Sequence, residues 1–277
     1  MMNKVYDKNL LGDILEVYMN DMIVKSQQEV DHAARLIKVF EQTWIYNMRL
    51  NLEKCTFGVQ ASKFLDFYLT ERGIEANLDK CRAFTELPTP HSKKCIQTLN
   101  GMLTALSRFV SKSAQHALPF FKLLRKETKF KWNDDCEATL KHLKETLSVT
   151  PVLSRPDQGE VLYLYLFVSS NAVSAVLVRE TPEGQKPVYF TSKALLGPET
   201  RYQKIEKVAL ALLTAARRLR QYFLAHTVIV RTDQPIRQIL GRLDVAGRMM
   251  KLSLELSEFD THYKSRKALK AHVFVTS

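Results

Sequence analysis

Hydrophobic and polar residues alternate near the start of the chain, in two short runs. The first run is Leu15-Glu16-Val17-Tyr18-Met19 and the second is Met22-Ile23-Val24, and the polar pair Asn20-Asp21 separates them. Alternation with a period of two is typical of strands, and a short polar turn joins two strands tightly. The pattern therefore predicts a β-hairpin.

A helix is predicted next, over residues 29–47, because apolar residues recur on one face at helical spacing. These residues are Leu36, Val39, Phe40 and Trp44. Short strands are then expected around Phe57, at residues 64–67 and around Ile74. This first part of the chain is thus predicted to combine a few strands with one long helix.

Prolines at positions 88 and 90 interrupt the pattern and mark a boundary. Two or three helices are predicted over residues 92–148. In the last of them, Asn133-Asp134 is a helix start signal, and an apolar stripe follows it: Cys136, Leu140, Leu143 and Leu147. Prolines at 151 and 156 mark a second boundary.

Strands dominate the remainder of the chain. Residues 161–168 are almost all apolar, as in a central strand that is buried on both faces. The order strand-strand-strand-helix-strand-helix-strand predicts a mixed sheet with helices packed on it, in an α+β or α/β fold. The other expected strands are 172–179, 187–191, 227–231 and 261–263, and the expected helices are 199–222, 236–240 and 246–257.

Composition and charge narrow the classes of protein to consider. The chain has 277 residues, enough for two domains with their own cores, and a formal net charge of +12, which favours polyanionic partners. The chain has four cysteines and no Cys-x-x-Cys pair, so a zinc site is not expected. Reduced thiols in an intracellular protein are expected instead. The longest strongly apolar run, 161–168, is too short to cross a membrane, and no signal peptide is visible.

Short motifs follow the predicted hairpin turn in a fixed order. They are Met48 to Phe57, Phe64-Leu65, Gly73-Ile74, Leu99-Asn100-Gly101, Ser107-Arg108-Phe109, Pro119 to Leu124, Phe130 to Asn133, Pro151-Val152-Leu153, Ser192 to Leu195 and Thr232-Asp233. In this order they resemble the Pol polyprotein of gypsy-class LTR retrotransposons, which carries a reverse transcriptase and a ribonuclease H. The resemblance covers nearly the whole chain.

The resemblance implies three domains. Residues 1–87 would be the C-terminal part of the reverse transcriptase palm, and residues 88–156 a helical thumb or connection region. Residues 157–277 would be an RNase H-like domain whose C-terminal helix is missing. The front half of the palm is expected upstream, so a truncated copy is predicted.

The polymerase site of the family includes the hairpin turn, which normally carries two adjacent aspartates that hold Mg²⁺. Here Asp21 keeps the second position, but Asn20 replaces the first and supplies no charge. The resemblance thus implies a weakened metal site at Asp21. The alternative is that Asn20-Asp21 is only a hairpin turn, since both residue types suit turns.

The ribonuclease site of the family needs about four carboxylates around two metals. The matching positions are Val168 on the first strand, Val208 on the long helix, Asp233 after the fourth strand and Thr276 near the end. Glu206 lies two residues from Val208, on the other side of a helix. One acid in four remains, so Mg²⁺ is not expected to bind productively, although Asp233 could equally be a solvated residue at a strand end.

Basic residues are concentrated between His91 and Lys131, where nine Lys or Arg accompany one acid, Glu127. This segment is either a surface that follows phosphates or a solvated helical face, and the first is favoured in a nucleic-acid enzyme. The expected nucleic-acid-binding residues are Lys93, Lys94, Arg108, Lys112, Lys122, Arg125, Lys126, Lys129 and Lys131.

The sequence therefore predicts a degenerate reverse transcriptase and ribonuclease H fragment. Its ancestral activities would be RNA-directed DNA synthesis and cleavage of RNA in RNA–DNA hybrids, both lost here. The alternatives are a non-catalytic nucleic-acid-binding module and a connector that binds other proteins. Expected partners are RNA, DNA or RNA–DNA hybrid and other Pol- or Gag-derived chains, in the cytoplasm or nucleus and without a membrane.

Overall fold

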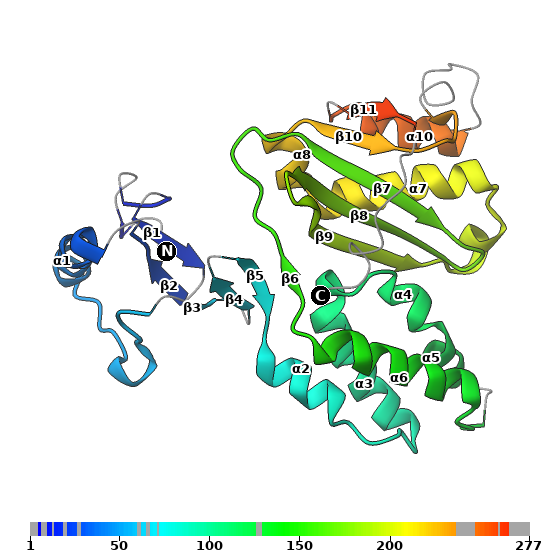
Figure 1. Ribbon diagram of the computed structural model, residues 1–277, viewed down its shortest axis with the longest axis horizontal. Coiled ribbons are helices and arrows are strands. Elements are labelled where there is room, and N and C mark those ends of the chain that lie inside the picture. The colour runs from blue at the N-terminus through cyan, green and yellow to red at the C-terminus, as the bar shows by residue number, and fades with distance from the viewer. Residues whose placement is uncertain are drawn as a thin grey trace. The chain divides into compact units, whose positions relative to one another are not determined.

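The computed structural model describes residues 5–6, 10–12, 14–18, 21–26, 29–59, 62–64, 67–70, 72–125, 129–236, 247–259 and 261–265. The chain divides into two compact units, Met1–Glu71 and Arg72–Ser277 (Figure 1). The predicted mixture of helices and sheets is confirmed.

The first unit contains the predicted hairpin. Strands β1 (Leu15–Tyr18) and β2 (Asp21–Val24) pair antiparallel, with Tyr18 opposite Asp21, so two residues join them. Helix α1 (Glu29–Ile45) follows, close to the predicted bounds. Its Val39 is buried together with three residues of the hairpin region, and these four side chains form the small core of this unit: Tyr6, Ile14, Leu15 and Val39.

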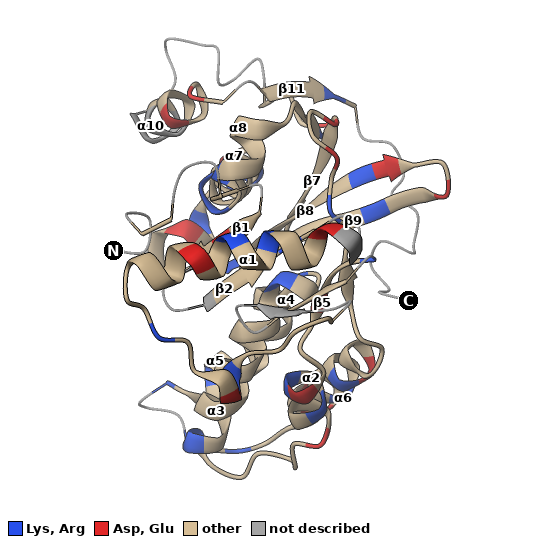
Figure 2. Ribbon diagram, turned by 90° about the vertical axis from the view of Figure 1, so that its left-hand side faces the viewer, with Lys and Arg blue, Asp and Glu red and all other residues tan. Residues whose placement is uncertain are grey.

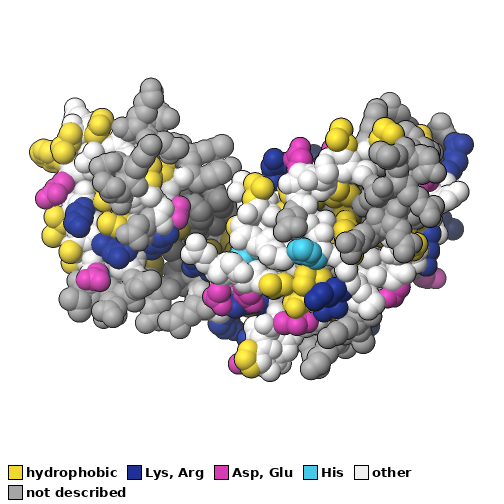
Figure 3. Space-filling model, turned by 90° about the horizontal axis from the view of Figure 1, so that it is seen from above, with side chains coloured by type: hydrophobic (Ala, Val, Ile, Leu, Met, Phe, Trp, Pro, Cys, Tyr) yellow, Lys and Arg dark blue, Asp and Glu magenta, His cyan; other side chains and the backbone are white. Residues whose placement is uncertain are grey.

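The apolar face predicted for α1 is only partly buried. Trp44 and Phe40 share the apolar spacing of α1, yet 86% and 39% of their surfaces are exposed, because the small core reaches only the part of the helix near Val39. Figure 3 shows hydrophobic side chains on the surface at the left, where α1 lies in Figure 1.

The strand predictions near the end of this unit also need correction. Strands β3 (Ser62–Phe64) and β4 (Phe67–Thr70) pair antiparallel with Phe64 opposite Phe67, so two strands are present where one was expected. Phe57 lies outside any strand.

The second unit begins with strand β5 (Gly73–Ala76), which pairs antiparallel with β6 (Val152–Leu153). The two strands approach so closely that a Cβ on Gly73 would lie 2.1 Å from the carbonyl oxygen of Leu153. The φ angle of Gly73 is +133°, which side chains disfavour, so both sterics and backbone require glycine here.

Helices fill the segment between these strands (Figure 1). They are α2 (Leu78–Thr85), α3 (Lys93–Leu106), the 3₁₀ turn η3 (Ser107–Phe109), α4 (Ser113–His116), α5 (Leu118–Leu123) and α6 (Asp134–Ser148). The predicted start of α6 is confirmed, because Asn133 accepts the amide hydrogen of Cys136. Its apolar stripe is buried as predicted, at Cys136, Leu140, Leu143 and Leu147.

The described strands of the last part form a five-stranded mixed sheet in the order β11-β10-β7-β8-β9. The pairs β7–β8 and β8–β9 are antiparallel, whereas β10 runs parallel to both β7 and β11. The predicted strand order is thereby confirmed. The strands are β7 (Leu162–Val168), β8 (Ala172–Thr181), β9 (Gly184–Ala194), β10 (Val228–Arg231) and β11 (Thr261–Lys264).

The long helix predicted over 199–222 is divided. A 3₁₀ turn, η4 (Gly197–Arg201), precedes α7 (Lys204–Arg218), and α8 (Arg220–Ala225) follows it. The break falls at Leu219, which leaves the helical backbone region with φ −110° and ψ 24° while its side chain stays in the core. Helix α10 (Gly247–Leu256) agrees with the prediction, and the helix expected at 236–240 lies outside the described residues beyond Ile236.

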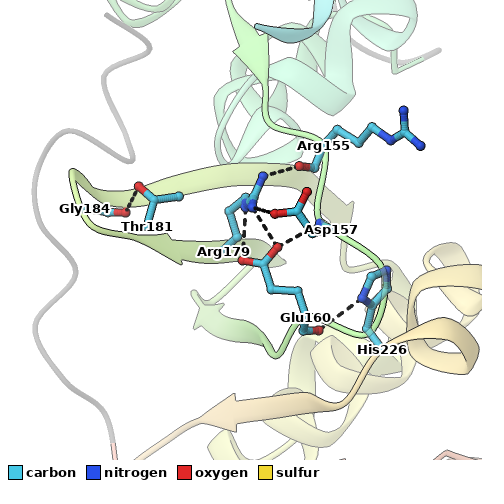
Figure 4. Close-up of polar contacts among 7 residues, drawn as sticks. All are labelled: Arg155, Asp157, Glu160, Arg179, Thr181, Gly184 and His226. Atoms are coloured by element: carbon cyan, nitrogen blue, oxygen red, sulfur yellow. Dashed lines mark hydrogen bonds and ion pairs between the residues drawn. The ribbon is translucent and has the colours of Figure 1, made fainter. Parts of the chain in front are cut away.

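Arg179 on β8 anchors the segment that leads into β7 (Figure 4). Its Nε donates to Glu160 Oε1 at 3.1 Å, and its other nitrogens bind Glu160, Asp157 and the carbonyl of Arg155. The carbonyl of Glu160 in turn lies 3.1 Å from His226 Nδ1. The Arg179 and Glu160 side chains are only 17% and 19% exposed, so neither charge is well solvated without the other.

Replacing Arg179 with Met should lower the free energy of unfolding by about 1–3 kcal/mol, because Glu160 would keep a half-buried charge without its partner. Urea unfolding measures this. Lys186→Met on β9 is the matched control, since Lys186 pairs with the exposed Glu183 and should change stability by less than about 0.5 kcal/mol. Equal small effects of both variants would contradict the prediction.

His116 should make stability depend on pH. Burial, then the neighbouring His142 and Lys112, lower the pKa of His116 from 6.5 to about 4. The unfolded chain therefore binds a proton more readily, and stability present above pH 6.5 should be lost as pH falls towards 4, by roughly 2–3 kcal/mol. The difference in unfolding free energy between the wild type and His116→Gln, followed from pH 7 to pH 4, measures this. A pH-independent difference would contradict it.

Candidate functional site

Three of the four family positions for the ribonuclease site meet at one end of the sheet. Val168 ends β7, and β10 runs beside it with Arg231 opposite Tyr165, so Asp233 follows two residues further along the same direction. Lys207 Nζ donates to the carbonyl of Ser170 at 2.9 Å, which fixes the first turns of α7 beside the end of β7. The sequence motifs thus point to one corner of the fold.

The two valines at this corner belong to the hydrophobic core. Val208 is 5% exposed and lies in the cluster between the sheet and α7, and Val168 is partly buried against the same cluster. Burial of a hydrated dication among such side chains is strongly unfavourable. The residues present therefore do not fit the two-metal centre of the family.

Glu206 is committed to the start of α7. Its Oε2 accepts the backbone N–H of Gln203 at 2.9 Å, in a capping box that begins the helix. This role holds its carboxylate near Gln203, in agreement with the prediction that Glu206 lies away from the Val208 side.

Lys207 is a residue of this corner that the sequence did not single out. Its side chain carries a charge, yet the residue is only 8% exposed. The ammonium held at Ser170 adds positive charge beside the end of β7, which disfavours a further cation there. Only its position between Glu206 and Val208 could have signalled this role.

Asp233 lies at the surface after β10. The preceding residue, Thr232, donates its backbone N–H to Lys264 O and accepts the N–H of Gln234 at its side chain. Within the described part of the chain, no three or more His, Cys, Asp or Glu side chains are arranged to hold a metal ion. The assignment of Asp233 to a metal site stays a prediction.

The remaining catalytic positions are described only in part. Asp21 begins β2 opposite Tyr18, at the predicted end of the hairpin turn. Asn20 and Thr276 lie outside the described residues. The predicted roles of the polymerase turn therefore stay predictions.

The basic residues of segment 91–131 divide into groups (Figure 2). Lys93 and Lys94 begin α3, and Lys93 Nζ donates to Arg125 O, just after α5, at 2.7 Å. Lys122, Arg125, Lys129 and Lys131 are exposed in or after α5. Lys126 lies outside the described residues.

Arg108 and Lys112 have a different environment. The guanidinium of Arg108 lies 5.4 Å from the Tyr189 ring, and Lys112 Nζ lies 5.0 Å from the Phe167 ring. Both cations therefore face aromatic rings of the sheet, whereas the group around α3 and α5 faces solvent. We define the basic edge as Lys93, Lys94, Lys122, Arg125, Lys129 and Lys131.

Comparison with known proteins identifies the family. Residues 132–230 match the model of the RNase H-like domain found in reverse transcriptase. The chain is also 26% identical over 258 residues to the retrovirus-related Pol polyprotein from transposon 412 of Drosophila melanogaster, with 93% of this chain covered. Residues 132–230 are therefore an RNase H-like domain of the kind found in reverse transcriptase, and over most of its length the chain is similar to retrotransposon Pol polyproteins.

Other Pol relatives agree. The Pol polyprotein from transposon 297 of Drosophila melanogaster is 28% identical over 91% of this chain, and the Tf2-3 polyprotein of Schizosaccharomyces pombe is 24% identical over 95%. The chain spans 21%, 24% and 21% of the lengths of the 412, 297 and Tf2-3 proteins.

Solved structures share the fold of this chain. The foamy viral protease-reverse transcriptase in complex with RNA/DNA hybrid has a TM-score of 0.78 at 18% identity, covering 98% of this chain and 37% of that one. A related foamy viral structure in complex with double-stranded DNA has a TM-score of 0.77 at 19% identity, covering 95% of this chain and 48% of that one.

Two further findings concern membrane-spanning helices and the cysteines. The described helices include none that is both long and apolar enough to cross a membrane. Cys55, Cys81, Cys95 and Cys136 are all free thiols.

Addition of millimolar Mg²⁺ should leave the melting temperature of the chain nearly unchanged, because a ligand that does not bind the native state does not stabilise it. Replacing Val168, Val208 and Thr276 with Asp, Glu and Asp should lower stability without metal, since like charges repel, and create a Mg²⁺-dependent rise. Thermal unfolding with and without Mg²⁺ measures both effects. A Mg²⁺ stabilisation of the unmodified chain that disappears in Asp233→Asn would show a working metal site.

Proposed function

We propose that this Pol chain binds double-stranded nucleic acid, in particular RNA–DNA hybrid, and catalyses neither DNA synthesis nor RNA cleavage. The observation that carries the proposed loss of catalysis is the packing of Val208 in the core, and of the partly buried Val168 against it, at two metal positions of the family. A degenerate copy that keeps its fold and its basic edge would retain binding after losing chemistry.

Loss of ribonuclease activity follows from the number of carboxylates. Asp233 alone would have to hold Mg²⁺, which gives up its water shell reluctantly and needs several oxygen ligands. Lys207, whose ammonium is fixed at Ser170, makes the corner less favourable still for a dication. The proposal therefore assigns no metal to this site and no catalytic step to Asp233.

Loss of polymerase activity rests on the hairpin turn. Asn20 offers a carbonyl oxygen in place of a carboxylate, so Asp21 is the one acid of this pair. A neutral amide contributes little to the charge that holds Mg²⁺ against its hydration. We propose that Asp21 holds no productive metal and that residues 1–87 form part of an inactive palm.

Binding is supported by charge and by the fold. The basic edge lies on the helical region, which we propose is the connection region at 88–156, with the RNase H-like domain at 157–277. The formal net charge of +12 raises the affinity for any polyanion. Structures of similar fold are complexes with double-stranded DNA and with RNA/DNA hybrid, which makes these duplexes the first ligands to test.

A second candidate is a connector that binds other Pol- or Gag-derived chains. The exposed apolar side chains of α1 favour it, since Ile37, Trp44 and Ile45 are 56%, 86% and 70% exposed. For either function we propose an intracellular location, cytoplasmic or nuclear, where nucleic acid and reduced thiols coexist.

The chain should bind an RNA–DNA hybrid with steep salt dependence and leave its RNA intact in Mg²⁺. Replacing Lys122, Arg125 and Lys129 with Gln should flatten the plot of log K against log salt, by about 1 for each phosphate that the variant no longer neutralises. Fluorescence anisotropy at several salt concentrations measures the slope, and gel analysis of the labelled RNA measures cleavage.

The matched control neutralises three exposed cations elsewhere, Lys141, Lys186 and Arg201. It changes the net charge equally and should leave the slope almost unchanged if the basic edge contacts the phosphates. Salt-independent binding or equal slopes for both triple variants would reject the basic edge. No hybrid binding at low salt would favour the connector, and metal-dependent RNA cleavage would reject the loss of catalysis.

A further inference from the structure

A pocket of about 320 Å³ lies within the second unit, between the helical region and the sheet. Helices α3, α4 and α5 line one side, and β9 and the end of α7 line the other. Its volume falls in the range of small-molecule sites in proteins. The pocket is separate from the corner of Val168 and Val208 and from the basic edge, so neither of those accounts for it.

Asn100 on α3 lines this pocket with an unsatisfied amide. Its side-chain nitrogen and oxygen are both shielded from solvent, and neither has a hydrogen-bond partner in the described structure. Leaving buried polar groups unpaired costs about 1–3 kcal/mol each, so such a group needs an explanation. A ligand that offers an acceptor and a donor side by side would satisfy both atoms.

The other walls favour a flat apolar ring with a charged substituent. Leu103 and Phe190 are buried there, and Phe121 on α5 leaves 41% of its surface exposed. An aromatic face of this kind can stack on a nucleobase. Arg218, exposed at the end of α7, supplies a cation at the rim that could pair with a phosphate.

We propose that this pocket binds an unpaired adenine nucleotide, with Asn100 pairing the base edge. Adenine presents its N6 amino donor beside its N7 acceptor, and a carboxamide pairs with both at once. Guanine presents two acceptors on the same edge, N7 and O6, so it leaves the amide oxygen unpaired. Phe121 stacks on the base and Arg218 contacts the phosphate.

The proposal deepens the proposed function, because it rests on a protein that binds nucleic acid and adds a site for one base outside the duplex. Replacing Asn100 with Leu removes the unpaired amide at similar volume, so it should leave stability unchanged or higher. Because Asn100→Leu should stay folded, a loss of nucleotide binding in this variant would not be due to unfolding.

The test is calorimetric titration of the full chain with AMP, GMP and ribose 5-phosphate. AMP should bind at least tenfold more tightly than ribose 5-phosphate and about fivefold more tightly than GMP. Asn100→Leu should remove the preference for AMP over GMP, and Phe121→Ala should weaken AMP at least fivefold. Gln97→Leu, at an exposed position of the same helix, should change nothing.

Several results would overturn the proposal. They are no AMP binding at millimolar concentration, equal binding of AMP and ribose 5-phosphate, or an AMP preference that persists in Asn100→Leu. Hybrid binding measured in parallel separates the two proposals. AMP binding without hybrid binding would reject the proposed function and keep the pocket, and the reverse result would reject the pocket.

Discussion

The apolar face of the β7–β8–β9 sheet packs on α7, and most of the second unit is arranged around that contact. Leu162, Leu164 and Leu166 alternate along β7 and meet the buried face of α7. Burial of this surface supplies the main driving force for folding this part of the chain. Val168 and Val208 lie on β7 and α7, the two elements that this contact joins.

The same contact bears on the proposed loss of catalysis, because the fold does not depend on a metal-binding cluster. Four carboxylates without metal repel one another, and each costs stability in a partly buried corner. Val168 and Val208 remove that repulsion and extend the apolar surface that α7 covers. At this corner, apolar side chains in place of carboxylates therefore favour the folded state.

Polar contacts then attach the helical region to the sheet. The backbone N–H of Ala114 donates to Ser192 Oγ at 3.1 Å, and that hydroxyl lies 2.8 Å from Ser174 Oγ. These bonds position α4 along β9 and so form one wall of the Asn100 pocket. The side-chain amide of Asn100, unpaired beside these hydrogen-bonded groups, is the observation that motivates a ligand in this pocket.

The sequence by itself determined the features that depend on local periodicity. It predicted the β1–β2 hairpin, the N-cap and apolar stripe of α6, and the order of the strands. These features depend on alternation and helical spacing among residues that are close in sequence. It also placed Val168, Val208 and Asp233 as members of one site, through their resemblance to family motifs in the same order.

Only the tertiary structure decided which groups meet across the chain. It exposed Trp44, paired Phe64 with Phe67 across two antiparallel strands, divided the long helix at Leu219, and brought Lys207 to Ser170. The unpaired state of Asn100 likewise depends on neighbours from distant segments. These outcomes follow from packing between residues far apart in sequence, which a local pattern does not contain.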